Sequence, residues 1–239
     1  MDQQKSGSTA IVVGVGGGLG WHLVKRFAAS GMAVAMAARN EDKLNRLLSA
    51  DPQEKVRPYA CDVADRSSVE RLFEAVARDL GSPDLVVFNA GAFTPGSILE
   101  IDPVEFERCW RVGCFGGFLV GRLAARAMVQ KGAGTILFTG ATASLRGSAR
   151  FANLAVPKFG IRALAQSMAR ELGPEGIHVG HVIIDGQIQS ERYRELAAEL
   201  GPDAMLSPDA IAEAFYQLHI QQRSAWTFEL DLRPWVERF

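Results

Sequence analysis

A glycine-rich loop follows the first apolar segment of the sequence. It reads Gly14-Val15-Gly16-Gly17-Gly18-Leu19-Gly20, and a helical pattern over residues 21–29 comes directly after it. Glycines permit a tight turn and a close approach of the backbone to a ligand, and the free N–H groups that open the next helix attract a pyrophosphate group. The alternative is a glycine-rich turn with a purely structural role. Because a strand precedes the loop and a helix follows it, the position favours a dinucleotide site.

The residues after the second apolar segment favour a phosphorylated dinucleotide. They read Ala37-Ala38-Arg39-Asn40, and they lack the acidic residue that would hydrogen-bond the ribose hydroxyls of NAD. The Arg39 guanidinium can instead pair with a 2′-phosphate group. A solvated arginine at the end of a strand is the alternative. We therefore expect the cofactor to be NADP(H) rather than NAD(H).

Apolar, β-branched segments alternate with helical patterns along the whole chain. The segments expected to be strands are residues 10–15, 33–37, 55–60, 85–89, 134–139, 177–184 and 226–232. The patterns expected to be helices lie near residues 19–30, 41–50, 66–80, 103–130, 152–173 and 208–221. This alternation is typical of an α/β fold with a doubly wound parallel sheet and helices on both faces. We expect a single Rossmann-fold domain whose sheet has about seven strands.

One stretch interrupts this alternation. Residues 187–206 are polar and include the run Glu191-Arg192-Tyr193-Arg194-Glu195. Such an insertion after a strand can act as a lid over a site. We therefore divide the domain into a cofactor-binding core (8–186), a lid (187–206) and a C-terminal helix and strand (207–239). Three residues of the lid either form an apolar wall of the substrate site or pack the lid onto the body: Tyr193, Leu196 and Leu200.

The composition excludes several classes of protein. The chain has 239 residues, with 26 Lys and Arg against 27 Asp and Glu, so its net charge is −1. This balance lacks the basic surface expected of a nucleic-acid-binding protein. The polar residues 1–9 lack the apolar segment of a secretory signal, and we expect no membrane partner. The cysteines and histidines lack the spacing of metal ligands, so we expect no metal site. We also expect a cytoplasmic protein whose thiols are reduced. These residues are Cys61, Cys109, Cys114, His22, His178, His181 and His219.

Several motifs, in order, resemble those of the short-chain dehydrogenase/reductase family. Gly14-x-x-x-Gly18-x-Gly20 resembles the family's cofactor loop, Asp62-Val63 its adenine-contacting pair, and Asn89-Ala90-Gly91 its N-A-G motif beside the cofactor. The resemblance covers about residues 9–232. Together with the loop and Arg39, it implies a set of cofactor-binding residues. They are Gly14, Gly16, Gly17, Gly18, Leu19, Gly20, Arg39, Asn40, Asp62, Val63, Asn89, Ala90, Gly91, Lys158, Gly186 and Ile188.

The positions that carry catalysis in this family depart from its pattern. The family uses a Tyr-x-x-x-Lys pair, in which the tyrosine hydroxyl exchanges a proton with the substrate oxygen and the lysine lowers the tyrosine pKa. Lys158 matches the lysine, but Leu154 stands at the tyrosine position. Ala141 stands at the position of the substrate-orienting serine, and Gly113 at that of an asparagine that supports a water relay. Lys158 is therefore the catalytic residue that the resemblance implies.

Neighbouring polar residues are candidates to replace the missing groups. Thr142 and Ser144 follow the serine position, and Asp185-Gly186 stands where the family has Pro-Gly. No residue among them replaces the tyrosine at equal reach. We therefore expect the two hydroxyls to hydrogen-bond the backbone and Asp185 to cap a helix or turn.

These observations support two alternative functions. The first is an NADP(H)-dependent oxidoreductase that acts on a small carbonyl or alcohol with a modified proton-transfer group. The second is a catalytically silent NADP(H)-binding protein that serves as a sensor or as a subunit of an assembly. Small and apolar residues in the helices expected near residues 103–130 and 152–173 also predict a homodimer or homotetramer, as the family resemblance implies.

Overall fold

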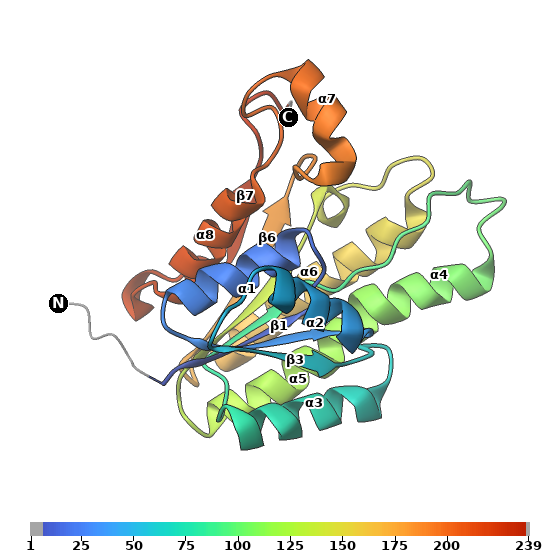
Figure 1. Cartoon of the computed structure of the whole chain (residues 1–239). Coiled ribbons are helices and arrows are strands. Elements are labelled where there is room, and N and C mark those ends of the chain that lie inside the picture. Colours follow the sequence, from blue (N-terminus) through green and yellow to red (C-terminus); the bar gives the residue numbers. More distant parts are fainter. Residues whose placement is uncertain (1–6, 238–239) are drawn as a thin grey trace.

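A single parallel sheet forms the centre of the molecule. The computed structural model describes residues 7–237. Its sheet has seven strands in the order β3-β2-β1-β4-β5-β6-β7, and every neighbouring pair is parallel (Figure 1). The strands are β1 (Thr9–Val13), β2 (Ala33–Ala38), β3 (Val56–Ala60), β4 (Leu85–Phe88), β5 (Gly134–Thr139), β6 (Ile177–Ile184) and β7 (Glu229–Leu232). The expected doubly wound Rossmann fold is confirmed.

Helices cover both faces of this sheet. They are α1 (Leu19–Ala29), α2 (Glu41–Ala50), α3 (Arg66–Asp79), α4 (Pro103–Trp110), α5 (Gly116–Val129), α6 (Ala152–Leu172), α7 (Arg194–Leu200) and α8 (Pro208–His219). Side chains of α1, α2 and α8 share one buried apolar cluster with the sheet, and side chains of α3, α5 and α6 share the other. The sheet is therefore buried on both sides.

Strand β1 shows how the sequence produces this arrangement. Ala10 and Val12 face the α1 side, whereas Ile11 and Val13 face the α5 side. All of these side chains have 0% exposure. A strand buried on both faces needs apolar residues at every position, which explains the continuous apolar segments in the sequence.

The strand order places a crevice at one edge of the sheet. β1 lies between β2 and β4. The chain moves outward from β1 to β3 in one direction and from β4 to β7 in the other. The loops that follow β1 and β4 therefore diverge at the carboxyl ends of these strands, where ligands bind in open α/β sheets.

Two of the expected strands differ from the structure by two or more residues at one end. β1 ends at Val13 rather than at residue 15, because the chain turns at Gly14, whose φ is +93°. β7 begins at Glu229 rather than at residue 226. The residues before it form a 3-10 turn, Arg223–Ala225, and the Trp226 ring stacks on His178 with the ring centroids 4.9 Å apart.

The single long helix expected over residues 103–130 is interrupted. A π-helical turn, Arg111–Phe115, joins α4 to α5. The turn packs against α6, and a Cβ atom added to Gly113 would lie 3.0 Å from the Pro157 Cβ atom. Any larger residue at position 113 would require Pro157 to shift, and such single π-turns are frequent at functional sites.

The same stretch, Pro103–Val129, is the only one in the described part of the chain whose length and apolar composition would allow it to cross a membrane. In the structure, α5 packs on the sheet through Leu119, Val120 and Ala124, which are all buried. This is the arrangement of a core helix.

Candidate cofactor and active site

The glycine loop is locked against the end of β4. The Asn89 side-chain amide donates a hydrogen bond of 3.0 Å to the Gly14 carbonyl oxygen. A Cβ atom on Gly14 would lie 2.8 Å from the Asn89 carbonyl carbon, and one on Gly20 would lie 2.8 Å from the Gly14 oxygen. These glycines are therefore needed so that the loop, α1 and the chain after β4 can pack together.

The middle of the loop is open. Gly16, Gly17 and Gly18 are exposed, and Cβ atoms on Gly16 and Gly18 would meet no described atom within 4 Å. Gly18 precedes the first turn of α1, and no side chain caps that end of the helix. The Leu19 side chain is buried, so Leu19 offers only its backbone N–H to this space. An open cradle at a helix N-terminus fits an anionic pyrophosphate group.

A cavity of about 530 Å³ lies beside this cradle. Gly16 and Gly17 line it, together with cationic side chains that the sequence analysis only partly identified: Arg39, Lys43 and Arg46. Asn40 also lines it, and its Oδ1 atom accepts a 3.0 Å hydrogen bond from the Lys43 backbone N–H, which caps α2. This cap directs the first turns of α2 toward the cavity, where Lys43 and Arg46 join Arg39.

A second cavity of about 470 Å³ brings most of the expected cofactor residues together. Its lining includes Gly14, Arg39, Asp62, Val63, Asn89, Ala90 and Gly91. Asp62 is fixed there because its Oδ1 atom accepts a hydrogen bond from the Ala64 N–H and its own N–H donates to the Ser68 hydroxyl, both at 3.0 Å. Arg39 lines both cavities, so the two spaces meet at its side chain.

Lys158 is a residue of α6, and its side chain reaches the end of β5. Its Nζ atom donates a 2.7 Å hydrogen bond to the backbone carbonyl of Thr139, the last residue of that strand. Burial lowers the pKa of Lys158 to about 8. This ammonium group therefore begins to lose its proton close to neutral pH, unlike an ordinary exposed lysine.

Leu154 and Ala141 flank the same region without offering polar side chains. Leu154 lies on α6 one turn before Lys158, on the same helix face. Ala141 follows β5, and its backbone N–H donates a 3.1 Å hydrogen bond to the Ser144 hydroxyl. The prediction that Ser144 bonds the backbone is thus confirmed.

The predictions for Thr142 and Asp185 are wrong. The Thr142 hydroxyl donates a 2.5 Å hydrogen bond to Oδ1 of Asp185 rather than to the backbone. Asp185 is only 6% exposed, and its Oδ2 atom forms an ion pair of 3.4 Å with Arg233 instead of capping a helix. The contact joins residues 43 positions apart, and no local pattern in the sequence identifies it.

Gly186 and Ile188 lie at the base of the expected lid rather than in the two cavities above. Gly186 packs against Pro234, and Ile188 forms a parallel bridge with Leu206 that closes the base of the segment. Beyond this bridge the chain forms a 3-10 turn, Glu191–Tyr193, and then α7. Leu196 and Leu200 of the lid are exposed, so they do not pack it onto the body.

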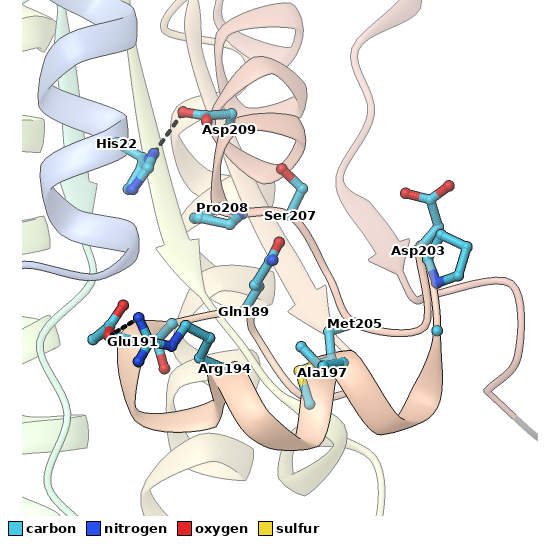
Figure 2. Close-up of a pocket in the computed structure, with 14 residues that line it drawn as sticks. His22, Gln189, Glu191, Arg194, Ala197, Asp203, Met205, Ser207, Pro208 and Asp209 are labelled. Atoms are coloured by element: carbon cyan, nitrogen blue, oxygen red, sulfur yellow. Dashed lines mark hydrogen bonds and ion pairs between the residues drawn. The ribbon is translucent and has the colours of Figure 1, made fainter.

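A third cavity, of about 820 Å³, lies between the lid, α1 and α8. Figure 2 shows the His22–Asp209 contact, with 2.5 Å between Nδ1 and Oδ1, on one side of it. The Glu191–Arg194 ion pair lies on the lid. All these side chains except His22 are mostly exposed, so the cavity is an open polar groove.

Comparisons with known proteins agree with this geometry. The model of the short chain dehydrogenase family matches residues 8–200. A short-chain dehydrogenase/reductase of Armillaria gallica is 30% identical over 200 residues, which cover 82% of this chain and 76% of that protein. The chain belongs to the short-chain dehydrogenase/reductase family, a family of oxidoreductases that bind nicotinamide cofactors and small-molecule substrates.

Solved structures have the same fold. A short-chain dehydrogenase from Rhodopseudomonas palustris has a TM-score of 0.83 and 38% identity, with 96% of this chain and 99% of that chain covered. A metagenomic short-chain oxidoreductase in complex with NADP has a TM-score of 0.83 and 24% identity, with 98% and 100% covered.

The low pKa of Lys158 predicts a pH-dependent stability. Between pH 8 and the ordinary lysine pKa of 10.5, the unfolded chain binds a proton that the folded chain does not bind. The contribution of Lys158 to the free energy of unfolding therefore rises with pH across this window, by on the order of 3 kcal/mol, and is lowest below pH 8. Lys158→Met should abolish this rise. Parallel urea titrations from pH 7 to 10.5 measure the difference, and equal pH slopes for the two proteins would contradict it.

Proposed function

We propose that the chain is an NADP(H)-binding oxidoreductase that acts on a small carbonyl or alcohol. The observation that supports this best is the open glycine cradle together with two cavities that both have Arg39 in their lining. Its residues fit the cofactor: helix N–H groups face the pyrophosphate position, and cationic side chains face the adjoining cavity. In the proposed binding mode, Asp62 and Val63 contact the adenine and Lys158 holds the ribose next to the nicotinamide.

The cation cluster supports the preference for NADP(H). Arg39, Lys43 and Arg46 line one cavity and would surround the 2′-phosphate, which NAD(H) lacks. Charge-assisted hydrogen bonds from arginine to phosphate are among the strongest in proteins. Among the residues that the structure describes, no carboxylate lines this cavity to bind the ribose hydroxyls instead.

The catalytic end of the site is modified. Bound nicotinamide supplies hydride-transfer chemistry, and the chain must orient the substrate and move a proton at its oxygen. Leu154 cannot transfer a proton, and Ala141 lacks the orienting hydroxyl. We therefore propose slow turnover of conventional carbonyl substrates, with residues 187–206 as the lid over the 8–186 core and residues 207–239 completing the domain.

A catalytically silent NADP(H)-binding protein is the second candidate. It is favoured by Gly113, Ala141 and Leu154, which together remove three groups that the family uses for proton transfer. The experiment that separates the candidates measures NADPH binding by nicotinamide fluorescence together with turnover at nicotinamide absorbance. Binding without turnover of carbonyls or alcohols would support the silent protein. Absence of binding would contradict both.

We also propose a cytoplasmic homodimer or homotetramer, with α5 and α6 at the interface. Large apolar side chains are exposed on these helices and on α4: Trp110 (38%), Phe118 (42%), Val156 (46%) and Phe159 (43%). The rings of Trp110, Phe115 and Phe118 stack in a row, with centroids 5.8 and 6.2 Å apart. A row of this kind, left in contact with water, is typical of a protein interface.

The cofactor preference is tested at Arg39. NADPH should bind more tightly than NADH by about 1.5 to 3 kcal/mol, or roughly ten- to a hundredfold, because of the charge-assisted contacts with the 2′-phosphate. Arg39→Ala should remove most of this gap without weakening NADH binding. Arg57→Ala is a matched control, since Arg57 is exposed on β3 and lines neither cavity. Fluorescence titration measures the affinities of all three proteins for NADPH and for NADH. Equal binding of NADPH and NADH by the unmutated chain would contradict the assignment.

Restoring the missing hydroxyls should raise turnover. The double substitution Leu154→Tyr with Ala141→Ser supplies a proton donor and an orienting group next to Lys158, and general acid catalysis typically contributes about 10² to 10⁴-fold. We expect faster NADPH-dependent reduction of the diketone benzil, with NADPH affinity nearly unchanged. Leu154→Phe with Ala141→Ser is the matched control that lacks the phenol hydroxyl. Equal rates for the Tyr and Phe variants would show that the proton donor is not what limits the reaction.

The proposed interface is tested by sedimentation at micromolar concentration. The unmutated chain should sediment as a dimer or tetramer. Phe118→Glu should shift it toward the monomer, because a charge would then be buried against the partner subunit. Val104→Glu, at a side chain that is 74% exposed near the start of α4, is the control. A monomeric unmutated chain would refute the interface.

A further inference from the structure

We propose that the Thr142 hydroxyl, hydrogen-bonded to Asp185, is the group that exchanges a proton with the substrate oxygen in this site. The proposal rests on the oxidoreductase function proposed above and names the residue that acts there in place of the absent tyrosine. Asp185 acts through Thr142, and Arg233 holds Asp185 in place.

The fold puts Thr142 and Asp185 at the carboxyl edge of the sheet. Thr142 lies three residues after the end of β5, and Asp185 follows the last residue of β6. β5 and β6 are adjacent and parallel, with Thr139 opposite Val182, so the two side chains meet across the end of this strand pair. Lys158 is bonded to Thr139 on the same edge, which brings Thr142 next to the expected ribose position.

The hydrogen bond to Asp185 determines whether the Thr142 hydroxyl can donate to a further partner or accept from one. Its proton is directed at Oδ1 of Asp185 at 2.5 Å. A hydroxyl that donates its only proton to a carboxylate has lone pairs left to accept from another donor. Thr142 is half-buried, in contrast to Asp185, which is almost fully buried. The Thr142 oxygen is therefore left as a hydrogen-bond acceptor, and an alcohol O–H group of a substrate would be the matching donor.

A second contact holds the other carboxylate oxygen of Asp185. Arg233 lies 3.4 Å from its Oδ2 atom, whereas Thr142 bonds Oδ1. Arg233 is also paired with Asp231. These contacts fix the position of Asp185 beside Thr142.

The proton transfer balances in both directions. During oxidation, the alcohol proton moves to the Thr142 oxygen as the threonine proton moves to Asp185. The C–H bond breaks with its electron pair, which leaves as hydride for C4 of NADP⁺, and the C=O bond forms. During reduction, Asp185 would first take up a proton from solvent. The carbonyl carbon would then receive the hydride that bound NADPH supplies, the substrate oxygen would take the Thr142 proton, and Thr142 would recover a proton from Asp185.

A purely structural role is the competing explanation. The Thr142–Asp185–Arg233 contacts also tie the turn Thr142–Ser144 to β6 and to the segment after β7. In that case loss of the hydroxyl would lower the melting temperature or the cofactor affinity. It would have no selective effect on kcat.

The test compares matched variants at Thr142. The probes are benzyl alcohol with NADP⁺ and benzil with NADPH, and NADPH binding and thermal melting are measured in parallel. Thr142→Val should lower kcat by about 10²-fold, the lower end of general acid–base effects, with NADPH affinity unchanged. Thr142→Ser keeps the hydroxyl and should retain most of the activity. The solvent deuterium isotope effect on kcat should be present in the unmutated chain and in the Ser variant.

Variants of the two carboxylates near Arg233 extend the test. Asp185→Asn should lower kcat with little change in KM, whereas Asp231→Asn, which removes a different carboxylate paired with Arg233, should leave kcat unchanged. Equal kcat values for Thr142→Val and the unmutated chain would overturn the proposal, as would NADPH binding without turnover of either probe. If the unmutated chain does not bind NADPH, the proposed function itself is wrong.

Discussion

The close contact between the loop after β1 and the chain after β4 is the constraint on which the whole site depends. Gly14 has a positive φ of +93° and lies against the Asn89–Ala90 backbone, where no side chain fits. Asn89 then bonds the Gly14 carbonyl and fixes the loop. Gly16 and Gly18 make no such contact and stay open. The two cavities lie beside the loop, one lined by Gly16 and Gly17 and the other by Gly14. The ligand space is thus a consequence of a packing contact.

The fold and the centre of the cofactor site could be predicted because their signals are local. Continuous apolar strands alternating with helices specify a doubly wound sheet, and glycines between β1 and α1 specify a phosphate loop. Lys43 and Arg46 were not predicted, although they lie three positions apart on the helix expected over residues 41–50, which follows Arg39. The Thr142–Asp185 bond and the π-turn could not be found in this way, because each depends on which distant segments the sheet brings together.

Two cationic residues of α6, Lys158 and Arg162, have different partners. One turn later on α6, Arg162 forms two 2.7 Å hydrogen bonds with Glu229, which also bonds Nδ1 of the buried His181. The Arg162 charge is therefore balanced by a carboxylate. Lys158, by contrast, bonds a backbone carbonyl, and burial opposes its charge. A lysine in this position is sensitive to any anion placed next to it, and a bound dinucleotide phosphate or a tyrosinate would raise its pKa again.

The departures from the family's catalytic pattern are physically connected through α6. Pro157 lies between Leu154 and Lys158 and contacts the π-turn at Gly113, where a Cβ atom would be 3.0 Å away. An asparagine at position 113 would therefore require Pro157 to shift, so a water relay through that position depends on the packing between the π-turn and α6. Leu154 lies on the same helix, three positions before Pro157. Because Gly113 and Pro157 are in contact, the effects of substitutions at these two positions should not be additive.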